Sequence, residues 1–302
     1  MNLYALYSIK HNTTVIDQVE DFTTNMNLSA LARSADGVID PAFAATIGGA
    51  PVIGFSTSAI ESALTLAGIG GLAIAPAASL VCALRKRLAG GIYAGASSHM
   101  TLTAANGLLI PRTLSADQSG VATISYEAHL FSSDGTTAPF VIATTATLAD
   151  TQLFDELFTV GPVNINGGAI DTVQSIAIDF GLEVIVRATK GLLWPLGAYV
   201  AARNPSIRIT SYDPTLLSTP IGQVGIDISS DVVIYLRGIQ AGVGPYANAS
   251  EQHLEFTVAD GRVSMGPISV AQGADAGVEI IVTPTTPDTT AIIAVAANQA
   301  IT

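Results

Sequence analysis

The two halves of this 302-residue chain align with each other at a constant offset of 154 residues. The run Ile16-Asp17-Gln18-Val19 returns as Ile170-Asp171-Thr172-Val173, and the register continues almost without gaps. Self-similarity at a fixed spacing is the signature of a duplicated structural unit. We therefore expect two domains of one fold, residues 1–150 and 151–302. Scarce residue types also coincide at this offset: Arg33 with Arg187, Pro41 with Pro195, and His99 with His253.

Most of the local sequence signals in each half indicate β-strands. Residues 173–180 alternate apolar and polar side chains, which is typical of a strand with one buried face. Asp36-Gly37 and Thr189-Lys190-Gly191 have the composition of turns, so each half is expected to contain a long hairpin. A third strand is expected after each hairpin, at residues 52–57 and 206–211.

A short helix and a second set of strands are expected to complete each half. Residues 58–67 carry apolar side chains on one helical face, and Asp213-Pro214 has the composition of the N-terminus of the matching helix. Asn106-Gly107 and Asp260-Gly261 are strong signals for tight hairpin turns. We therefore predict a mainly β protein of two tandem antiparallel β-sandwiches, each with a long hairpin and one short helix.

The composition limits the classes of partner. The net charge is −12, with 24 acidic against 12 basic residues, so the chain lacks the basic stripe that nucleic-acid binding requires. Charged residues make up 12% of the chain and hydrophobic residues 49%, which indicates a surface partly buried against other copies of the chain. Cys82 is the only cysteine, which excludes an intrachain disulfide and a cluster of thiolate metal ligands.

An apolar stretch at residues 59–84 is not expected to cross a membrane. Several glycines and Pro76 interrupt it, and its counterpart at residues 213–238 carries charges that a bilayer disfavours. The first residues of the chain also lack the basic segment and long apolar run of a secretory signal. We therefore expect no membrane partner.

The sequence contains no motif for catalysis or metal binding. No Gly-x-Ser-x-Gly nucleophile motif occurs, and none of the histidines has the spacing of metal ligands. His99 and His253 precede equivalent strands, and a hydrogen bond to a neighbouring strand is the expected role of both. We predict that the protein is not an enzyme and needs no cofactor and no metal. The four histidines are His11, His99, His129 and His253.

Two features occur in one half only. Arg85-Lys86-Arg87 is the only basic run, and Ile239-Gln240-Ala241 stands at the equivalent positions. We expect the three cations to contact an acidic neighbouring subunit, a contact with phosphate being the alternative. Trp194, the only tryptophan, precedes Pro195 at the end of the hairpin turn, and we expect it to be a packing or docking anchor.

The order of elements in both halves resembles that of the tail tube proteins of long-tailed bacteriophages. The likeness is carried by the first strand and long hairpin, residues 16–55 and 170–209, and by the small helix and closing strands that follow. The resemblance implies a tail-tube-like β-sandwich with a flanking helix in each half. It also implies rings of six such domains around a barrel-like inner wall. Some members of the family fuse two domains, so that three chains form one pseudo-hexameric ring.

For this chain the resemblance implies a structural virion protein, a tail tube subunit assembled in the host cytoplasm. Homotrimeric rings would stack into a tube, contact other tail proteins and let genomic DNA pass through the lumen without specific binding. An acidic lumen would keep DNA phosphates off the wall, and Asp21, Asp179 and Glu183 are expected to face it. The hairpin tips are expected to form the assembly surface: Asp36, Gly37, Lys190, Gly191 and Trp194.

Two other functions also fit a duplicated β protein. One is a double jelly-roll major capsid protein, whose pseudo-hexameric trimers tile a shell. Such domains need about eight strands each and usually have long loops, whereas the connections here are short. The other is a carbohydrate-binding or other β-sandwich module. It would need a polar or aromatic cluster, whereas aromatic residues make up 6% of the chain.

Overall fold

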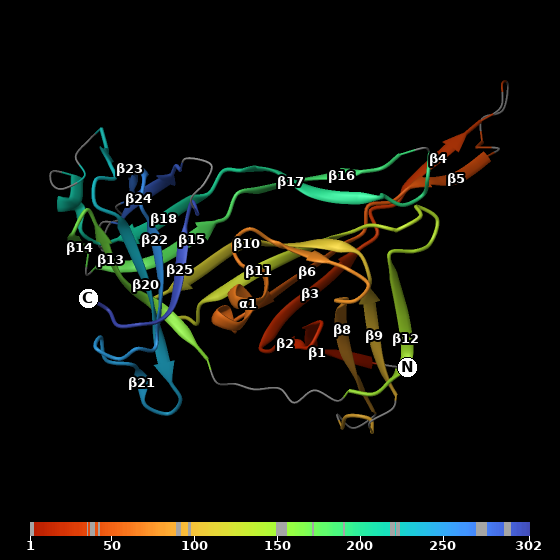
Figure 1. Cartoon of the computed structure of the whole chain (residues 1–302), viewed down its shortest axis with the longest axis horizontal. Helices are drawn as coiled ribbons and strands as arrows, with labels where there is room; N and C mark the ends of the chain where they lie inside the picture. The colour runs from red at the N-terminus through yellow and green to blue at the C-terminus, as the bar shows by residue number, and fades with distance from the viewer. Residues whose placement is uncertain are drawn as a thin grey trace.

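The computed structural model describes residues 3–34, 36, 40–41, 43–88, 92–95, 98–148, 156–170, 172–189, 191–217, 221, 224–269, 277–286 and 291–302. These residues form a mainly β protein, as the sequence predicts, and the strands pair antiparallel in several sheets (Figure 1). One α-helix is found in this part of the chain, α1 (Ile60–Ala67).

The largest sheet, here called the long sheet, has ten strands and runs through both halves of the chain (Figure 1). Alternate residues of its strands are buried; in β11, for example, Ile124 and Tyr126 are buried and the residues between them are not. One face of the long sheet therefore lies in the core, and the other is its outer face. Nine strands lie in the order β19 (Ile226–Asp227), β23 (Gly261–Ser269), β24 (Gly277–Pro284), β18 (Ser206–Ser211), β15 (Val173–Asp179), β10 (Gly107–Asp117), β11 (Thr123–Leu130), β6 (Val52–Thr57), β3 (Val19–Asn25), and β7 (Leu72–Ile74) also pairs with β10.

Two smaller sheets, one from each half, supply the other side of the core. The buried residues of all three sheets form one continuous cluster, which includes Ile9, Ile53 and Phe256. The first smaller sheet has the order β12 (Phe140–Ala146), β9 (His99–Ala104), β8 (Leu80–Arg87), β1 (Leu3–His11), β2 (Thr14–Ile16). The second has the order β14 (Gly168–Ile170), β13 (Phe158–Ile165), β20 (Val232–Gln240), β22 (His253–Val258), β25 (Ala294–Gln299), and β21 (Gly244–Pro245) also pairs with β20.

Each half also carries a two-stranded hairpin that extends from the long sheet (Figure 1). The third strand expected after each hairpin forms at the predicted residues, as β6 and β18. β6 pairs with β3 and β18 pairs with β15, so these segments are the bases of the returning hairpin arms. Pro51 and Pro205 precede them, and because a proline has no N–H it interrupts the ladder and divides each arm in two. The hairpins are β4 (Ser29–Arg33) with β5 (Phe43–Gly48), and β16 (Leu182–Arg187) with β17 (Gly197–Arg203).

The helix α1 lies between the core of the first half and the second half. Four of its side chains are buried on one face, as the apolar pattern predicts. The Glu156 carboxylate, from the second half, accepts the backbone N–H groups of Glu61 and Ser62, both at 3.2 Å. The first turn of a helix has no backbone acceptors for these N–H groups and favours negative charge. Glu156 therefore caps the helix and ties the two halves together.

The matching helix in the second half is a single 3₁₀ turn, η1 (Pro214–Leu217), which corrects the prediction of one α-helix per half. Asp213 caps this turn, because its Oδ1 accepts the hydroxyl of Thr215 at 2.6 Å and its N–H at 2.9 Å. These hydrogen bonds lower the pKa of Asp213. The sequence then reaches Pro220, which lacks the N–H that a longer helix would use.

The strand pairings of the two halves correspond at the offset of 154. In the first half Gly107 pairs with Leu130 and Ser115 with Thr123. Adding 154 to each number gives Gly261 with Pro284 and Ser269 with Gly277, which are pairs of the second half. A bulge also recurs, between Pro111 and Leu114 and between Met265 and Ile268. Apart from β21, each strand described in one half thus has a counterpart in the other.

The two halves are joined by the pairing of β10 with β15. Five residue pairs make this ladder, from Thr113 with Asp179 to Asp117 with Ser175. Two further backbone bonds extend it, since Phe180 N–H donates to the Arg112 carbonyl at 3.0 Å and Gln118 N–H to the Gln174 carbonyl at 2.9 Å. The β10–β15 ladder makes two five-stranded arrays one continuous sheet.

A second contact between the halves surrounds Trp194, which is only 6% exposed. Its backbone N–H donates to the Gly135 carbonyl at 3.0 Å, and the neighbouring Leu193 carbonyl accepts the backbone N–H of Gly49 at 2.9 Å. A Cβ at Gly49 would lie 2.7 Å from the indole, so only glycine lets the backbone approach this closely. Of the two roles expected for Trp194, the structure places it in packing within the chain, where it is not available for docking.

We predict that Trp194→Ala destabilises the protein by about 3 kcal/mol, the typical cost of truncating a buried aromatic side chain. Urea unfolding followed by circular dichroism measures the change. Tyr199→Ala, at a half-exposed position of the same hairpin, is the control and is expected to lose less than about 1 kcal/mol. Equal losses in the two variants would contradict the packing role of Trp194.

The loop that receives Trp194 is organised by Asp134. Its Oδ1 accepts the N–H groups of Thr136 and Thr137, both at 2.8 Å, and its Oδ2 accepts the Thr137 hydroxyl at 2.7 Å. Ser132 donates its hydroxyl to the same carboxylate at 2.8 Å. These hydrogen bonds, led by those from Thr137, hold the pKa of Asp134 well below its usual value of 3.8.

A lowered carboxyl pKa predicts the pH dependence of this loop. The stabilisation is present above pH 3.8, the unfolded-state value, and is lost as the pH falls through the folded-state value. Asp134→Asn should therefore have a lower Tm than the wild type at neutral pH, and the difference should shrink as the pH falls below 3.8. Thermal melts across this range test the prediction, with Asp36→Asn as a charge-matched control. A difference that is independent of pH would refute it.

Candidate functional site: the outer face of the long sheet

The outer face of the long sheet is built mainly from small polar side chains. Strand alternation places Ser and Thr residues on it from most strands, and hydrogen bonds between neighbouring strands join several of them. Thr113 and Ser125 hydroxyls lie 2.8 Å apart, and those of Ser115 and Thr123 lie 3.2 Å apart. Such hydroxyls satisfy one another across the ladder.

Each arginine on this face is paired with an acid. The ion pairs are Arg112 with Glu127 at 3.0 Å, Arg208 with Glu279 at 3.1 Å, and Arg262 with Asp227 at 2.7 Å. Among the described residues, three further acids of the face have no ion-pair partner. Asp21 accepts the Ser56 hydroxyl at 3.4 Å and Asp179 accepts the Gly181 N–H at 2.9 Å. The third, Asp117, lies at the end of β10.

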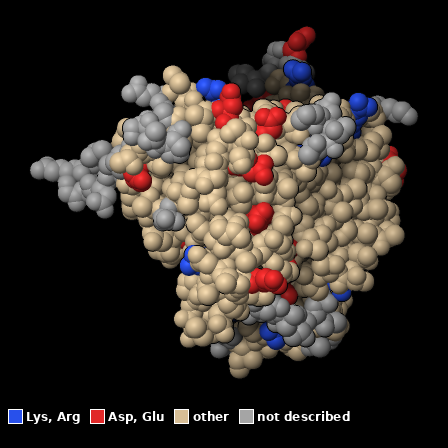
Figure 2. Space-filling model, turned by 60° about the vertical axis from the view of Figure 1, so that its left-hand side comes forward, with Lys and Arg blue, Asp and Glu red and all other residues tan. Residues whose placement is uncertain are grey.

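The balance of charge on the outer face is therefore negative. His129 does not offset it near neutral pH, because burial lowers its pKa although Glu127, 3.4 Å away, opposes the shift. In Figure 2 the surface on view is largely uncharged, with acidic side chains spread along its middle. The arrangement disfavours adhesion of a polyanion.

Two shallow hollows lie on the outer face. One, of about 450 Å³, lies beside the Arg112–Glu127 pair and includes Asp21. The other, of about 320 Å³, includes Asp179, Glu183 and Asn204. Glu183 is exposed on β16, and its carboxylate accepts the Asn204 amide at 3.3 Å. The predicted lumen acids Asp21 and Asp179 thus share the outer face, and Glu183 lies at its margin. Sequence reasoning missed Asp117, although the alternation along residues 113–117 could have indicated it.

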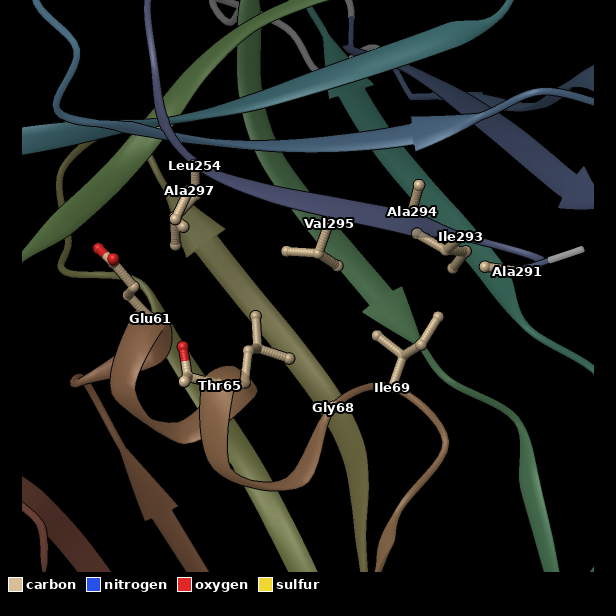
Figure 3. Close-up of a pocket in the computed structure, with 11 residues that line it drawn as sticks. Glu61, Thr65, Gly68, Ile69, Leu254, Ala291, Ile293, Ala294, Val295 and Ala297 are labelled. Atoms are coloured by element: carbon tan, nitrogen blue, oxygen red, sulfur yellow. The ribbon is translucent and has the colours of Figure 1, made fainter. Parts of the chain in front are cut away.

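An apolar groove of about 460 Å³ lies at the seam between the halves (Figure 3). Thr65 and Ile69, on and just after α1, face Val295 and Ile293 across it. Glu61 and Thr65 bring the few polar atoms that line the groove. The groove is the imperfectly filled contact between α1 and β25.

The two equivalent histidines are buried and bonded to neighbouring strands. His99 Nδ1 accepts the Lys86 N–H, and His253 Nδ1 accepts the Gly238 N–H, both at 3.1 Å. His253 Nε2 also lies 3.0 Å from the Ala247 carbonyl. Both residues therefore make the kind of bond that their position in the sequence predicts.

The basic run lies at the end of β8, among aromatic side chains. Arg85 stacks on Tyr7 and Tyr93, with distances of 5.5 and 4.4 Å to the ring centroids. Arg87 lies 5.9 Å from the Tyr93 ring. These cation–π contacts hold two of the three cations against the chain itself. A contact of Arg85, Lys86 and Arg87 with a neighbouring subunit stays a prediction.

The hairpin tips are only partly described. Asp36 is exposed in the turn between β4 and β5, and Gly191 is exposed in the turn between β16 and β17 with φ +65°. Gly37 and Lys190 lie outside the described residues. The assignment of these tips to an assembly surface stays a prediction.

Across the described ranges, the side chains of His, Cys, Asp and Glu do not gather into a group of three that could hold a metal ion. In the same ranges, no helix has both the length and the apolar character needed to cross a membrane. Neither a scan against models of known protein families nor a search of curated proteins finds a match for this chain. The geometry of the molecule is thus the basis for inferring its function.

Proposed function

We propose that this chain is a structural virion protein, the subunit of a bacteriophage-type tail tube. Three chains would form a pseudo-hexameric ring of six tail-tube-like domains, and rings would stack into a tube. The tube would join other tail proteins and conduct genomic DNA without binding it specifically. The protein would be assembled in the host cytoplasm and act without a cofactor, as a structural protein and not as an enzyme.

One observation carries the proposal: the long sheet passes from one half of the chain to the other. β10 and β15 pair across the boundary, while β3 and most of β23 have one edge without a partner among the strands that the structure describes. Free strand edges are hazards that proteins pair or cover, and closing a sheet on itself removes them. A ring of chains would pair every edge and leave the outer face as the lining of a channel.

The correspondence of the two halves supports an origin by duplication. Pairing registers, sheet orders and a bulge recur at the offset of 154. Two units that already meet edge to edge within one chain are suited to repeat that contact between chains. The proposed domains, residues 1–150 and 151–302, follow from this correspondence.

The outer face has the properties that a DNA-conducting wall requires. Its arginines are paired with acids, and Asp21, Asp117 and Asp179 add negative charge that repels phosphates. A surface that binds DNA instead needs unpaired cations that release counterions. The hairpins support stacking of rings, because apolar side chains are exposed on both: Phe43, Ile47, Ile185 and Tyr199.

Electron microscopy of the purified protein tests the proposal. We expect rings or hollow filaments with six-fold features made by three chains, because the sheet edges and exposed hairpin side chains both call for neighbours. Flat sheets or closed shells would favour the capsid alternative, and dispersed monomers at high concentration would overturn the assembly proposal altogether.

A charge variant tests the role of the outer face. Asp21→Lys/Asp117→Lys/Asp179→Lys should bind duplex DNA at low salt at least about tenfold more tightly than the wild type, with an affinity that falls steeply as salt increases. The matched control, Asp36→Lys/Asp40→Lys/Glu251→Lys, changes the net charge equally away from this face. Fluorescence anisotropy with labelled duplex DNA measures both. Equal binding by the control would show that the outer face has no special role.

A further inference from the structure

We propose that β23 of one copy pairs antiparallel with β3 of the next copy, in the register that β10 and β15 show within the chain. The inference rests on the self-assembly part of the proposed function and not on the passage of DNA. It assigns the partner, a second copy of this chain, and the residues that meet. The contact is head to tail, because the two edges of the chain differ.

The internal junction supplies the register. Thr113 pairs with Asp179 and Leu114 with Ile178. The backbone hydrogen bonds from the Phe180 N–H to the Arg112 carbonyl and from the Gln118 N–H to the Gln174 carbonyl show which residue pairs of this ladder are hydrogen-bonded. Because hydrogen-bonded and non-bonded pairs alternate, Leu114 and Ile178 form a bonded pair, and Thr113 and Asp179 form a non-bonded pair with closer side chains.

Adding 154 to the β10 residues and subtracting 154 from the β15 residues gives the contact between copies. Thr113 with Asp179 becomes Pro267 with Asn25, and Leu114 with Ile178 becomes Ile268 with Thr24. Within the described ranges, the β23 edge is paired with β19 only at Arg262 and Val263, just as β7 occupies only the first residues of β10. Among the described strands, β3 pairs with β6 alone, and its other edge has no strand partner.

The residues where β3 and β23 would meet between copies resemble those where β15 and β10 meet within the chain. The Asn25 side-chain oxygen accepts the Asn27 N–H at 2.9 Å, as the Asp179 carboxylate accepts the Gly181 N–H at 2.9 Å. The same side-chain turn thus ends β3 and β15. Pro267 falls at a non-bonded position, where no N–H is directed to the incoming strand, so its missing donor does not oppose pairing.

Exposed apolar side chains lie on the surfaces that the proposed contact would cover. Leu114 is fully buried at the internal junction, whereas its counterpart Ile268 is 48% exposed. On β25, Val295 is covered across the groove by Ile69 and α1 (Figure 3), whereas its counterpart on β12, Val141, is 66% exposed. Ile142 beside it is 55% exposed. A neighbouring copy placed as the internal junction dictates would cover β12 with its second half.

Disulfide trapping tests the register. In Asn25→Cys/Pro267→Cys, both cysteines lie at exposed positions of a predicted non-bonded pair, within the Cα distance that a disulfide spans. We expect mild oxidation to give covalent dimers and trimers on non-reducing gels. Thr113→Cys/Asp179→Cys is the matched internal control and should close within one chain. Cys82 is buried and does not interfere.

Two further variants define the outcomes. Thr23→Cys/Pro267→Cys is shifted by two residues, beyond disulfide reach, and should give at least about tenfold less product. Equal product from it would overturn the register. Single Asn25→Cys or Pro267→Cys chains should cross-link when mixed but not alone; dimers of one single variant would overturn the head-to-tail order. No product from Asn25→Cys/Pro267→Cys, while the internal control closes, would overturn the contact.

A proline variant provides a test that needs no cysteine. Thr24→Pro removes the N–H that would donate to Ile268 of the next copy, but not a donor of the β3–β6 ladder, so the chain should fold and fail to assemble. Thr24→Ala keeps the N–H and should assemble. Unchanged assembly of a folded Thr24→Pro chain would overturn the pairing.

The same experiments distinguish this inference from the proposed function. Cross-linked rings that never stack into tubes would refute the proposed function and leave this inference standing. Tubes that form without the disulfide cross-links would refute this inference and leave the proposed function standing.

Discussion

The need of every strand edge for backbone partners governs this molecule. β10 has one edge to share, and it gives the first residues to β7 and the remainder to β15 of the other half. The other contacts between the halves depend on that ladder. With β15 in place, the hairpin β16–β17 brings Trp194 over Gly49, and Glu156 reaches the first turn of α1. The two halves therefore share one core and one sheet.

Local patterns in the sequence predicted much of this fold. Period-two alternation indicated the strands β9, β10, β22 and β23, and the offset of 154 anticipated that elements recur in the same order. The hairpins expected at Asn106-Gly107 and Asp260-Gly261 were wrong, because β9 and β22 belong to the smaller sheets whereas β10 and β23 belong to the long sheet, so the chain crosses between sheets at these turns. The strands β6 and β18 were placed correctly, but only pairing between distant residues shows that they continue the hairpin arms beyond Pro51 and Pro205. The length of the second helix was overestimated, because its capping residue Asp213 is present but the helix is only the short 3₁₀ turn η1.

The outer face could be predicted only in part. Alternation placed Asp21 and Asp179 on one face of their strands, but the pairing of Arg112 with Glu127 joins residues on neighbouring strands and follows from register alone. Trp194 shows the same limit. Its rarity marked it as an anchor, yet its burial depends on Gly49, which lies more than a hundred residues away and has no side chain to signal the contact.

The covalent link between the halves has a consequence for the rate of assembly. Every second junction of the proposed ring is already made when the chain folds, at the high effective concentration that a short tether provides. A nucleus of six separate domains would need five encounters in solution, whereas three fused pairs need two. The proposed ring also alternates two chemically distinct contacts, the β10–β15 ladder within a chain and the β23–β3 contact between chains. The residues of one contact can therefore change in sequence while the other contact preserves the ring. Fusion thus separates the evolution of subunit recognition from the integrity of the sheet.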